Sequence, residues 1–182
     1  MCGVFLFSWE LKKDENSIKV YTQDVKDSKY DEFRAVMKIK APFEKVKAVL
    51  LDFKNYPKWQ KKIDKIAVSN GYMFKCLDFP FPLSNRHAYY NMNIKNASDE
   101  INVSIKSVPY KNLPDEIKKS LPKPCGVEMK DTAFIYAKKI PEGTEVVYQA
   151  KVDPNGAPAF IFNSKIVSAG YETLDNLKDM LK

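Results

Sequence analysis

The chain has 182 residues, a length that favours one domain with a substantial core. Its 45% hydrophobic and 29% charged residues exclude a largely disordered chain. The net charge of +7 comes from scattered lysine pairs, which fit either a lysine-rich soluble surface or attraction to an anionic membrane. Nucleic acid is disfavoured, because no helix-turn-helix, zinc-finger or RNP signature accompanies the charge.

The cysteines and the single histidine limit the chemistry further. Three isolated cysteines with no CxxC pair, and one histidine, make a zinc site improbable, and we expect no metal and no cofactor. An odd cysteine count also argues against a disulfide framework. The longest uncharged run, Pro154 to Ser164, is far shorter than the ~20 residues of a membrane span.

Residues 1–8 (MCGVFLFS) have two interpretations. The first is a strand or staple that packs on the core, and with this interpretation we expect a cytoplasmic protein. The second is the end of an export signal, since a short apolar stretch ends in a small residue, and it accompanies an exported or periplasmic protein.

The first half of the chain alternates strand and helix patterns. Strict alternation of apolar and polar residues predicts strands over 18–23 and 33–39. A helix follows from Pro42, with one apolar stripe that ends near Pro57. Trp59 then follows as a structural plug at the helix end. Two strands are expected over 63–77, hinged at Asn70-Gly71, which is a strong hairpin dipeptide.

Residues 79–130 hold two strands between irregular segments. Alternation predicts strands over 86–94 and 101–105, after an apolar, proline-rich loop at 79–83. The excursion over 108–130, with a short helix between Pro114 and Leu121, is typical of a lid or binding loop. The two loops predict either packed surface loops or a gate that touches membrane, built from Phe79, Phe81 and Leu83 with Lys118, Lys119 and Lys123.

The chain closes with a hairpin and a long helix. Strands are expected over 132–140 and 144–152, and an amphipathic helix over 158–181. Gly170 in mid-helix costs ~1 kcal/mol relative to Ala, so either a strand or a ligand passes close to it. The order of elements predicts an α+β fold in which a curved antiparallel sheet wraps around the C-terminal helix.

Four stretches of the chain resemble StAR-related lipid-transfer (START) domains, particularly the short bacterial single-domain kind. They cover most of the chain from Trp9 and occur in the family's order. They are 9–13 followed by 18–21 (WELKK, IKVY), 52–59 (DFKNYPKW), 79–86 (FPFPLSNR), and 153–156 (DPNG) with Pro158, Asn163 and Thr173-Leu174.

The resemblance implies the helix-grip fold over a single domain, 1–182, with a lipid-sized hydrophobic tunnel between sheet and helix. It implies a non-catalytic, monomeric carrier of a lipid or other apolar molecule, in transient contact with an anionic membrane surface. The sequence departs from the family where His87 follows Arg86 in place of the usual Asp. Met92 also lies near the arginine of the buried charged pair that some members carry. The expected cavity is therefore apolar and aromatic.

Candidate tunnel residues share large apolar or aromatic side chains. They are Met37, Tyr90, Met92, Phe134, Tyr136, Tyr148, Phe162, Ile166 and Gly170. Arg86 is expected either to contact an anionic head group or to anchor its loop through carbonyl groups. His87 is expected on the outer face as a surface residue, without the partner that a catalytic base needs.

Two functions remain open at this point. The first is non-catalytic binding and transfer of a lipid or apolar small molecule. The second is an enzyme of the related polyketide cyclase/dehydratase type, which acts on a small aromatic or apolar substrate. Converging ionisable groups with perturbed pKa values inside the cavity would favour the enzyme, and a wall of apolar and aromatic side chains would favour binding.

Overall fold

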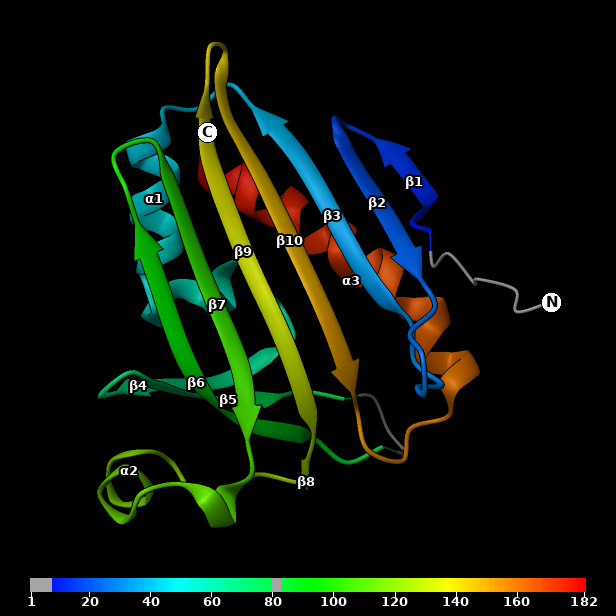
Figure 1. Ribbon diagram of the computed structural model, residues 1–182, viewed down its shortest axis with the longest axis vertical. Helices are drawn as coiled ribbons and strands as arrows, with labels where there is room; N and C mark the ends of the chain where they lie inside the picture. The colour runs from blue at the N-terminus through cyan, green and yellow to red at the C-terminus, as the bar shows by residue number, and fades with distance from the viewer. Residues whose placement is uncertain (1–7, 80–82) are drawn as a thin grey trace, which may run out of the picture.

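The fold is one large, mostly antiparallel sheet that grips a long helix (Figure 1). The structure is a computed structural model that describes residues 8–79 and 83–182. Within these residues ten strands pair in the order β1-β2-β3-β10-β9-β7-β6-β5-β4, and β8 pairs with β6 in parallel. The strands are β1 (Glu10–Glu15), β2 (Ile18–Gln23), β3 (Glu32–Ile39), β4 (Ile63–Ser69), β5 (Tyr72–Leu77), β6 (Arg86–Asn96), β7 (Glu100–Val108), β8 (Val127–Glu128), β9 (Lys130–Ile140) and β10 (Gly143–Asp153).

The helices lie at defined places on this sheet. The C-terminal helix α3 (Ala159–Met180) packs on β2 and β3, and α1 (Phe43–Leu51) packs on β9. A 3-10 helix, η1 (Phe53–Lys58), follows α1, while η2 (Tyr110–Asn112) and α2 (Asp115–Ser120) belong to the segment between β7 and β8. The predicted α+β helix-grip architecture is confirmed. None of the helices in the described ranges is long and apolar enough to cross a bilayer.

Alternation along each strand decides which side chains face α3. On β3 the side chains of Phe33, Ala35 and Met37 are buried on the face that α3 covers, which we call the inner face. Val146 on β10 pairs with Met37 and is buried with it. The hairpin expected at Asn70-Gly71 joins β4 to β5, and both residues have the positive φ that this tight turn requires.

Gly170 is where α3 lies closest to the sheet. A Cβ at this position would stand 2.8 Å from Cδ2 of Phe33 and 3.6 Å from Cβ of Ala35. The close neighbour is therefore a side chain of β3, which is the packed-strand alternative of the two that the sequence left open.

We expect Gly170→Leu to lower the free energy of unfolding by about 2 kcal/mol, because its side chain must displace the Phe33 ring. Ala169→Leu is the matched control, since Ala169 is exposed on the same turn and its change stays within about 0.5 kcal/mol. Urea unfolding of both variants measures the difference. Equal stabilities would show that the helix does not pack this closely on β3.

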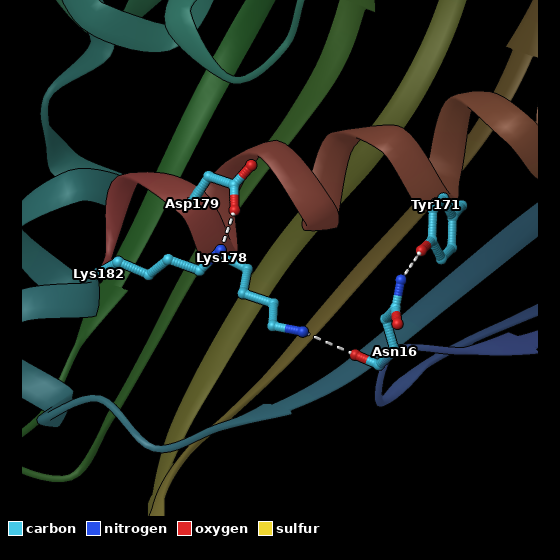
Figure 2. A network of polar contacts seen from close by, with 5 residues as sticks. All are labelled: Asn16, Tyr171, Lys178, Asp179 and Lys182. Atoms are coloured by element: carbon cyan, nitrogen blue, oxygen red, sulfur yellow. Dashed lines mark hydrogen bonds and ion pairs between the residues drawn. The ribbon is translucent and has the colours of Figure 1, made fainter.

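The C-terminal half of α3 is fastened to the turn between β1 and β2 (Figure 2). Asn16 Nδ2 donates a hydrogen bond of 2.7 Å to the Tyr171 hydroxyl, and Lys178 Nζ donates one of 2.9 Å to the Asn16 carbonyl. Lys182 and Asp179 form an ion pair at the helix end. The two hydrogen bonds with Asn16 join the last turns of α3 to the edge of the sheet.

The excursion between β7 and β9 packs on the outer face of the sheet. Leu113, Ile117 and Leu121 form a second hydrophobic cluster with Phe74 and Tyr89, which point away from α3. The two open alternatives for this segment thus resolve toward packed loops over most of its length. Phe81 and residues 1–7, which also entered the sequence predictions, lie outside the described residues.

His87 lies on the outer face, as predicted, but it is buried and is not a surface residue. The excursion covers it, and its Nδ1 lies 2.6 Å from the Cys125 carbonyl oxygen. Its ring is near those of Phe74 and Tyr89. The position of His87 is therefore that of a packing residue beneath the excursion.

Cys76 and Cys125 form a disulfide between β5 and the end of the excursion. This corrects the inference from the odd cysteine count, which argued against disulfide bonding. Two cysteines pair across 49 positions of sequence, and their Cα atoms lie 6.2 Å apart. The bond links the end of the excursion to β5, next to the second hydrophobic cluster.

Candidate functional site

A lysine and an aspartate side chain lie on the largely apolar and aromatic inner face of the sheet. Lys75 extends from β5 on the same face as Met73, because alternate residues of a strand share a face. Asp131 extends from β9 on the same face as Ala133. Strands β6 and β7 separate β5 from β9, so folding brings together two groups that are 56 positions apart in the sequence.

Lys75 is buried, with 6% of its surface exposed. Its Nζ donates a hydrogen bond of 3.2 Å to Gln60 Oε1 and lies 5.6 Å from the centre of the Tyr56 ring and 5.7 Å from that of Tyr90. Loss of water lowers the pKa of Lys75 to about 8, and the nearby charge of Asp131 partly opposes this shift.

Asp131 is held by one neighbour and has free hydrogen-bonding capacity. The Tyr90 hydroxyl donates a hydrogen bond of 2.9 Å to Asp131 Oδ2, while Oδ1 is buried without a hydrogen-bond partner. Burial raises the pKa of the Asp131 carboxyl, and Lys75 and the Tyr90 hydrogen bond oppose the shift. Burial likewise raises the pKa of Tyr148 on β10, with the Asp131 charge as a second cause.

The space at this site has two parts. A cavity of about 20 Å³, enough for roughly one water molecule, is lined by residues that include Tyr56, Gln60, Lys75 and Tyr148. A groove of about 840 Å³ lies at the end of β9 and β10, and Asp131 is one of its lining residues. The lipid-sized tunnel that the resemblance implies is thus replaced here by a small cavity and a large groove.

Most of the predicted tunnel residues lie in the inner core, on the sheet or on α3. Tyr148 contacts the ring of Phe33 edge-on at 5.2 Å, and Phe162 contacts the ring of Tyr30 in the same way at 5.3 Å. The other inner residues from the prediction are Met37, Tyr90, Met92, Ile166 and Gly170. These seven residues therefore lie between the sheet and α3, as predicted.

The side chains of Phe134 and Tyr136 are placed differently from the prediction, although Phe134 still borders the inner cavity. They alternate with Ala133, Ile135 and Ala137, whose side chains form part of the inner core, and so they point to the outer face. The Tyr136 hydroxyl accordingly donates a hydrogen bond of 2.8 Å to Glu100 Oε2 in an exposed pair. The large aromatic side chains suggested an inner position, but the alternation of residues along β9 places them on the outer face.

Arg86 is buried and bound to backbone carbonyl groups. Its Nε donates to the Pro154 oxygen, and its two Nη atoms donate to the oxygens of Ser84 and Asn155. The guanidinium also lies 5.2 Å from the centre of the Phe79 ring. Arg86 thus joins Phe79 and Ser84 to the segment that leads into α3, as the anchoring alternative predicted.

Sequence reasoning missed Lys75 and Asp131 as inner residues. A signal was present, because Lys75 stands between Met73 and Leu77 in strict alternation on a strand that is apolar on both faces. Asp131 likewise stands two residues before Ala133. A metal site is not indicated, since the described part of the chain holds no group of three or more His, Cys, Asp or Glu suited to a metal ion.

Comparisons with known proteins agree with the fold. No protein-family model matches the chain. An uncharacterized protein of Pseudomonas aeruginosa is 29% identical over 180 residues, which cover 93% of this chain and 85% of that protein. A STAR-related lipid transfer protein from Xanthomonas axonopodis, solved as a fragment, is 28% identical, with a TM-score of 0.78 and coverage of 95% of this chain and 98% of that one.

More distant solved structures share the fold alone. Human StAR-related lipid transfer protein 5 is 15% identical, with a TM-score of 0.77 over 95% of this chain and 86% of that one. The di-domain ARO/CYC StfQ of steffimycin biosynthesis is 11% identical, with a TM-score of 0.51 over 82% of this chain and 50% of that one. In sequence pattern and in fold, this chain resembles the StAR-related lipid-transfer (START) domains, including the bacterial single-domain kind.

Proposed function

We propose that the protein binds a lipid or other apolar molecule between the sheet and α3, with the polar end of the ligand at Lys75 and Asp131. The observation that carries the proposal is Asp131 Oδ1, which is buried without a hydrogen-bond partner where Asp131 lines the groove, with Lys75 near enough for its charge to act on the carboxyl group. A buried carboxylate oxygen without a partner is costly, and a ligand hydroxyl or amide would satisfy it.

The ligand reaches this site through the groove at the end of β9 and β10. The volume of this groove, about 840 Å³, lies in the range of small-molecule sites, whereas the inner cavity of about 20 Å³ is too small for a lipid. Binding therefore requires side chains between the two spaces to move apart. Asp131 stands on this route, because it lines the groove and its charge acts on Lys75.

Native mass spectrometry of the gently purified protein, followed by organic extraction, tests the proposal. We expect a bound apolar molecule in the wild type and its loss in Ala133→Phe, because Ala133 lines the inner cavity and the ring would fill it. Lys138→Phe on the exposed side of β9 is the matched control and should retain the ligand. A wild type that carries nothing and takes up no added lipid would contradict the proposal.

We also propose that the start of α3 contacts an anionic membrane during transfer. Phe160 is 77% exposed and Ile161 is 42% exposed on the first turn of this helix. Lys165 is exposed one turn later and can face lipid phosphates. Arg86 places Phe79 next to the segment that leads into this turn.

For the double variant Phe160→Ser/Ile161→Ser, we expect binding to anionic vesicles to fall at least about tenfold. Burial of one such side chain contributes ~1.5–3 kcal/mol, and ~1.4 kcal/mol is tenfold in affinity. Leu11→Ser is the control, because Leu11 is 48% exposed on β1. Vesicle co-sedimentation measures the effect, and equal losses in both variants would place the contact elsewhere.

A second candidate function is supported by the same pair of groups. Lys75, Asp131 and Tyr90 converge in the interior with perturbed pKa values, which is the arrangement that favours an enzyme of the cyclase/dehydratase type. The binding function is favoured because the walls around them are apolar and aromatic. Turnover of an added small aromatic polyketide substrate, lost in Asp131→Asn, would support the enzyme instead.

A further inference from the structure

The amine of Lys75 is set apart from the other basic groups of the chain by its surroundings. None of the ion pairs between described residues includes Lys75, and its one hydrogen bond goes to the neutral amide of Gln60. Burial of an ammonium group without a close counter-ion is costly, so the site raises the fraction of neutral amine above that of an exposed lysine. A neutral, desolvated lysine amine is a nucleophile.

The groups around this amine suit proton transfer. They come from η1, from the second residue after it, and from three strands. They are Tyr56, Gln60, Tyr90, Asp131 and Tyr148. Asp131 is the one carboxyl group of this set, and burial favours its protonated form. Its Oδ2 is held by Tyr90, while Oδ1 is free toward a ligand.

We propose that Lys75 Nζ forms a reversible imine with the carbonyl carbon of an apolar aldehyde or ketone bound at this site. The inference rests on the proposed binding function and extends it to a chemical class of ligand, the carbonyl compounds. It gives Lys75 a covalent role that an ordinary lipid carrier does not need.

The step is balanced within the site. The nitrogen lone pair attacks the carbonyl carbon, a C–N bond forms, and the carbonyl oxygen becomes a hydroxyl by taking a proton that the nitrogen loses. Asp131 then gives its proton to this hydroxyl, which leaves as water while the C=N bond forms. The second nitrogen proton returns to Asp131. The sum is amine plus carbonyl giving imine plus water, with no oxidation or reduction.

Reductive trapping tests the inference. The whole protein is incubated with hexadecanal and sodium cyanoborohydride at pH 7.5, digested, and mapped by mass spectrometry. We expect the stable secondary amine to form on Lys75 at least tenfold faster than on exposed lysines, because binding holds the aldehyde next to the amine. Lys138→Met, on the exposed part of β9, is the control and should leave this labelling unchanged.

Lys75→Arg and Lys75→Met remove the nucleophile in two ways. Both should lose the trapped product, and circular dichroism and thermal melting establish that at least one of them is folded. Binding of 1-hexadecanol, which cannot form an imine, is measured in parallel. If wild-type protein binds hexadecanol but the label spreads over surface lysines, the imine proposal is contradicted. The proposed binding function then still stands. If wild-type protein binds neither compound, both inferences fail.

The dependence of trapping on pH provides an independent readout. The pKa of Lys75 is about 8, so the fraction of neutral amine should rise most steeply between about pH 7 and 9 and level off above about pH 9. Exposed lysines, with ordinary pKa values near 10.4, should continue to gain reactivity above pH 9. A Lys75 profile that matches the exposed lysines would contradict the proposal.

Discussion

Reduction of the Cys76–Cys125 disulfide should lower the free energy of unfolding by about 4 kcal/mol. The bond closes a loop across 49 positions, and the chain-entropy model gives ~4 kcal/mol for a loop of this size. Urea unfolding with and without dithiothreitol measures the loss. The double variant Cys76→Ala/Cys125→Ala should show a similar loss under both conditions.

Cys2, the third cysteine, provides the control. Cys2→Ala should remain sensitive to dithiothreitol, since it leaves the Cys76–Cys125 pair unchanged. A wild type whose stability does not respond to the reductant would contradict the expectation. Disulfides are typical of oxidising compartments and rare in the cytoplasm.

Arg86→Met should lower the free energy of unfolding by about 3 kcal/mol. The substitution leaves the buried Pro154 carbonyl group without its donor, and a buried unsatisfied group costs ~1–3 kcal/mol. It also removes the charged hydrogen bonds to the partly exposed carbonyl groups of Ser84 and Asn155. Methionine keeps much of the apolar stem. Arg86→Lys should recover only part of the loss, because one ammonium group cannot match the planar fork.

Arg34→Met is the control for Arg86, since Arg34 is half-buried and its Nε donates to Gln149 at the sheet surface. Its effect should stay below about 1 kcal/mol. Thermal and urea unfolding compare the variants. If Arg86→Met were as stable as Arg34→Met and instead lost affinity for anionic lipid, the head-group role would replace the anchoring one.

The sequence alone predicted the elements whose patterns are local. Alternation over 33–39 and the apolar stripe of 158–181 depend on neighbouring residues, so β3 and α3 follow from them directly. The turn at Asn70-Gly71 is likewise a two-residue signal. The low helix propensity of Gly170 also indicated a close approach, which proved to be the ring of Phe33.

The candidate site could be predicted only in part, because its groups come from distant strands. The aromatic layer with Tyr90 and Tyr148 follows from apolar patterning. Phe134 and Tyr136 show the limit of that reasoning. Residue size suggests burial, but the pairing of β9 with β7 and β10 decides which face each side chain occupies.

The sequence by itself thus determined most of the secondary structure, though not β1 or β8, together with the gripped C-terminal helix and the resemblance to lipid-transfer domains. Only the tertiary structure decided that Lys75 and Asp131 share one interior site and that Cys76 bonds to Cys125. The physical reason is that periodicity records which face a residue occupies on its own strand. The order of strands β9-β7-β6-β5 determines which side chains become neighbours across that face, and this order exists only in the assembled sheet.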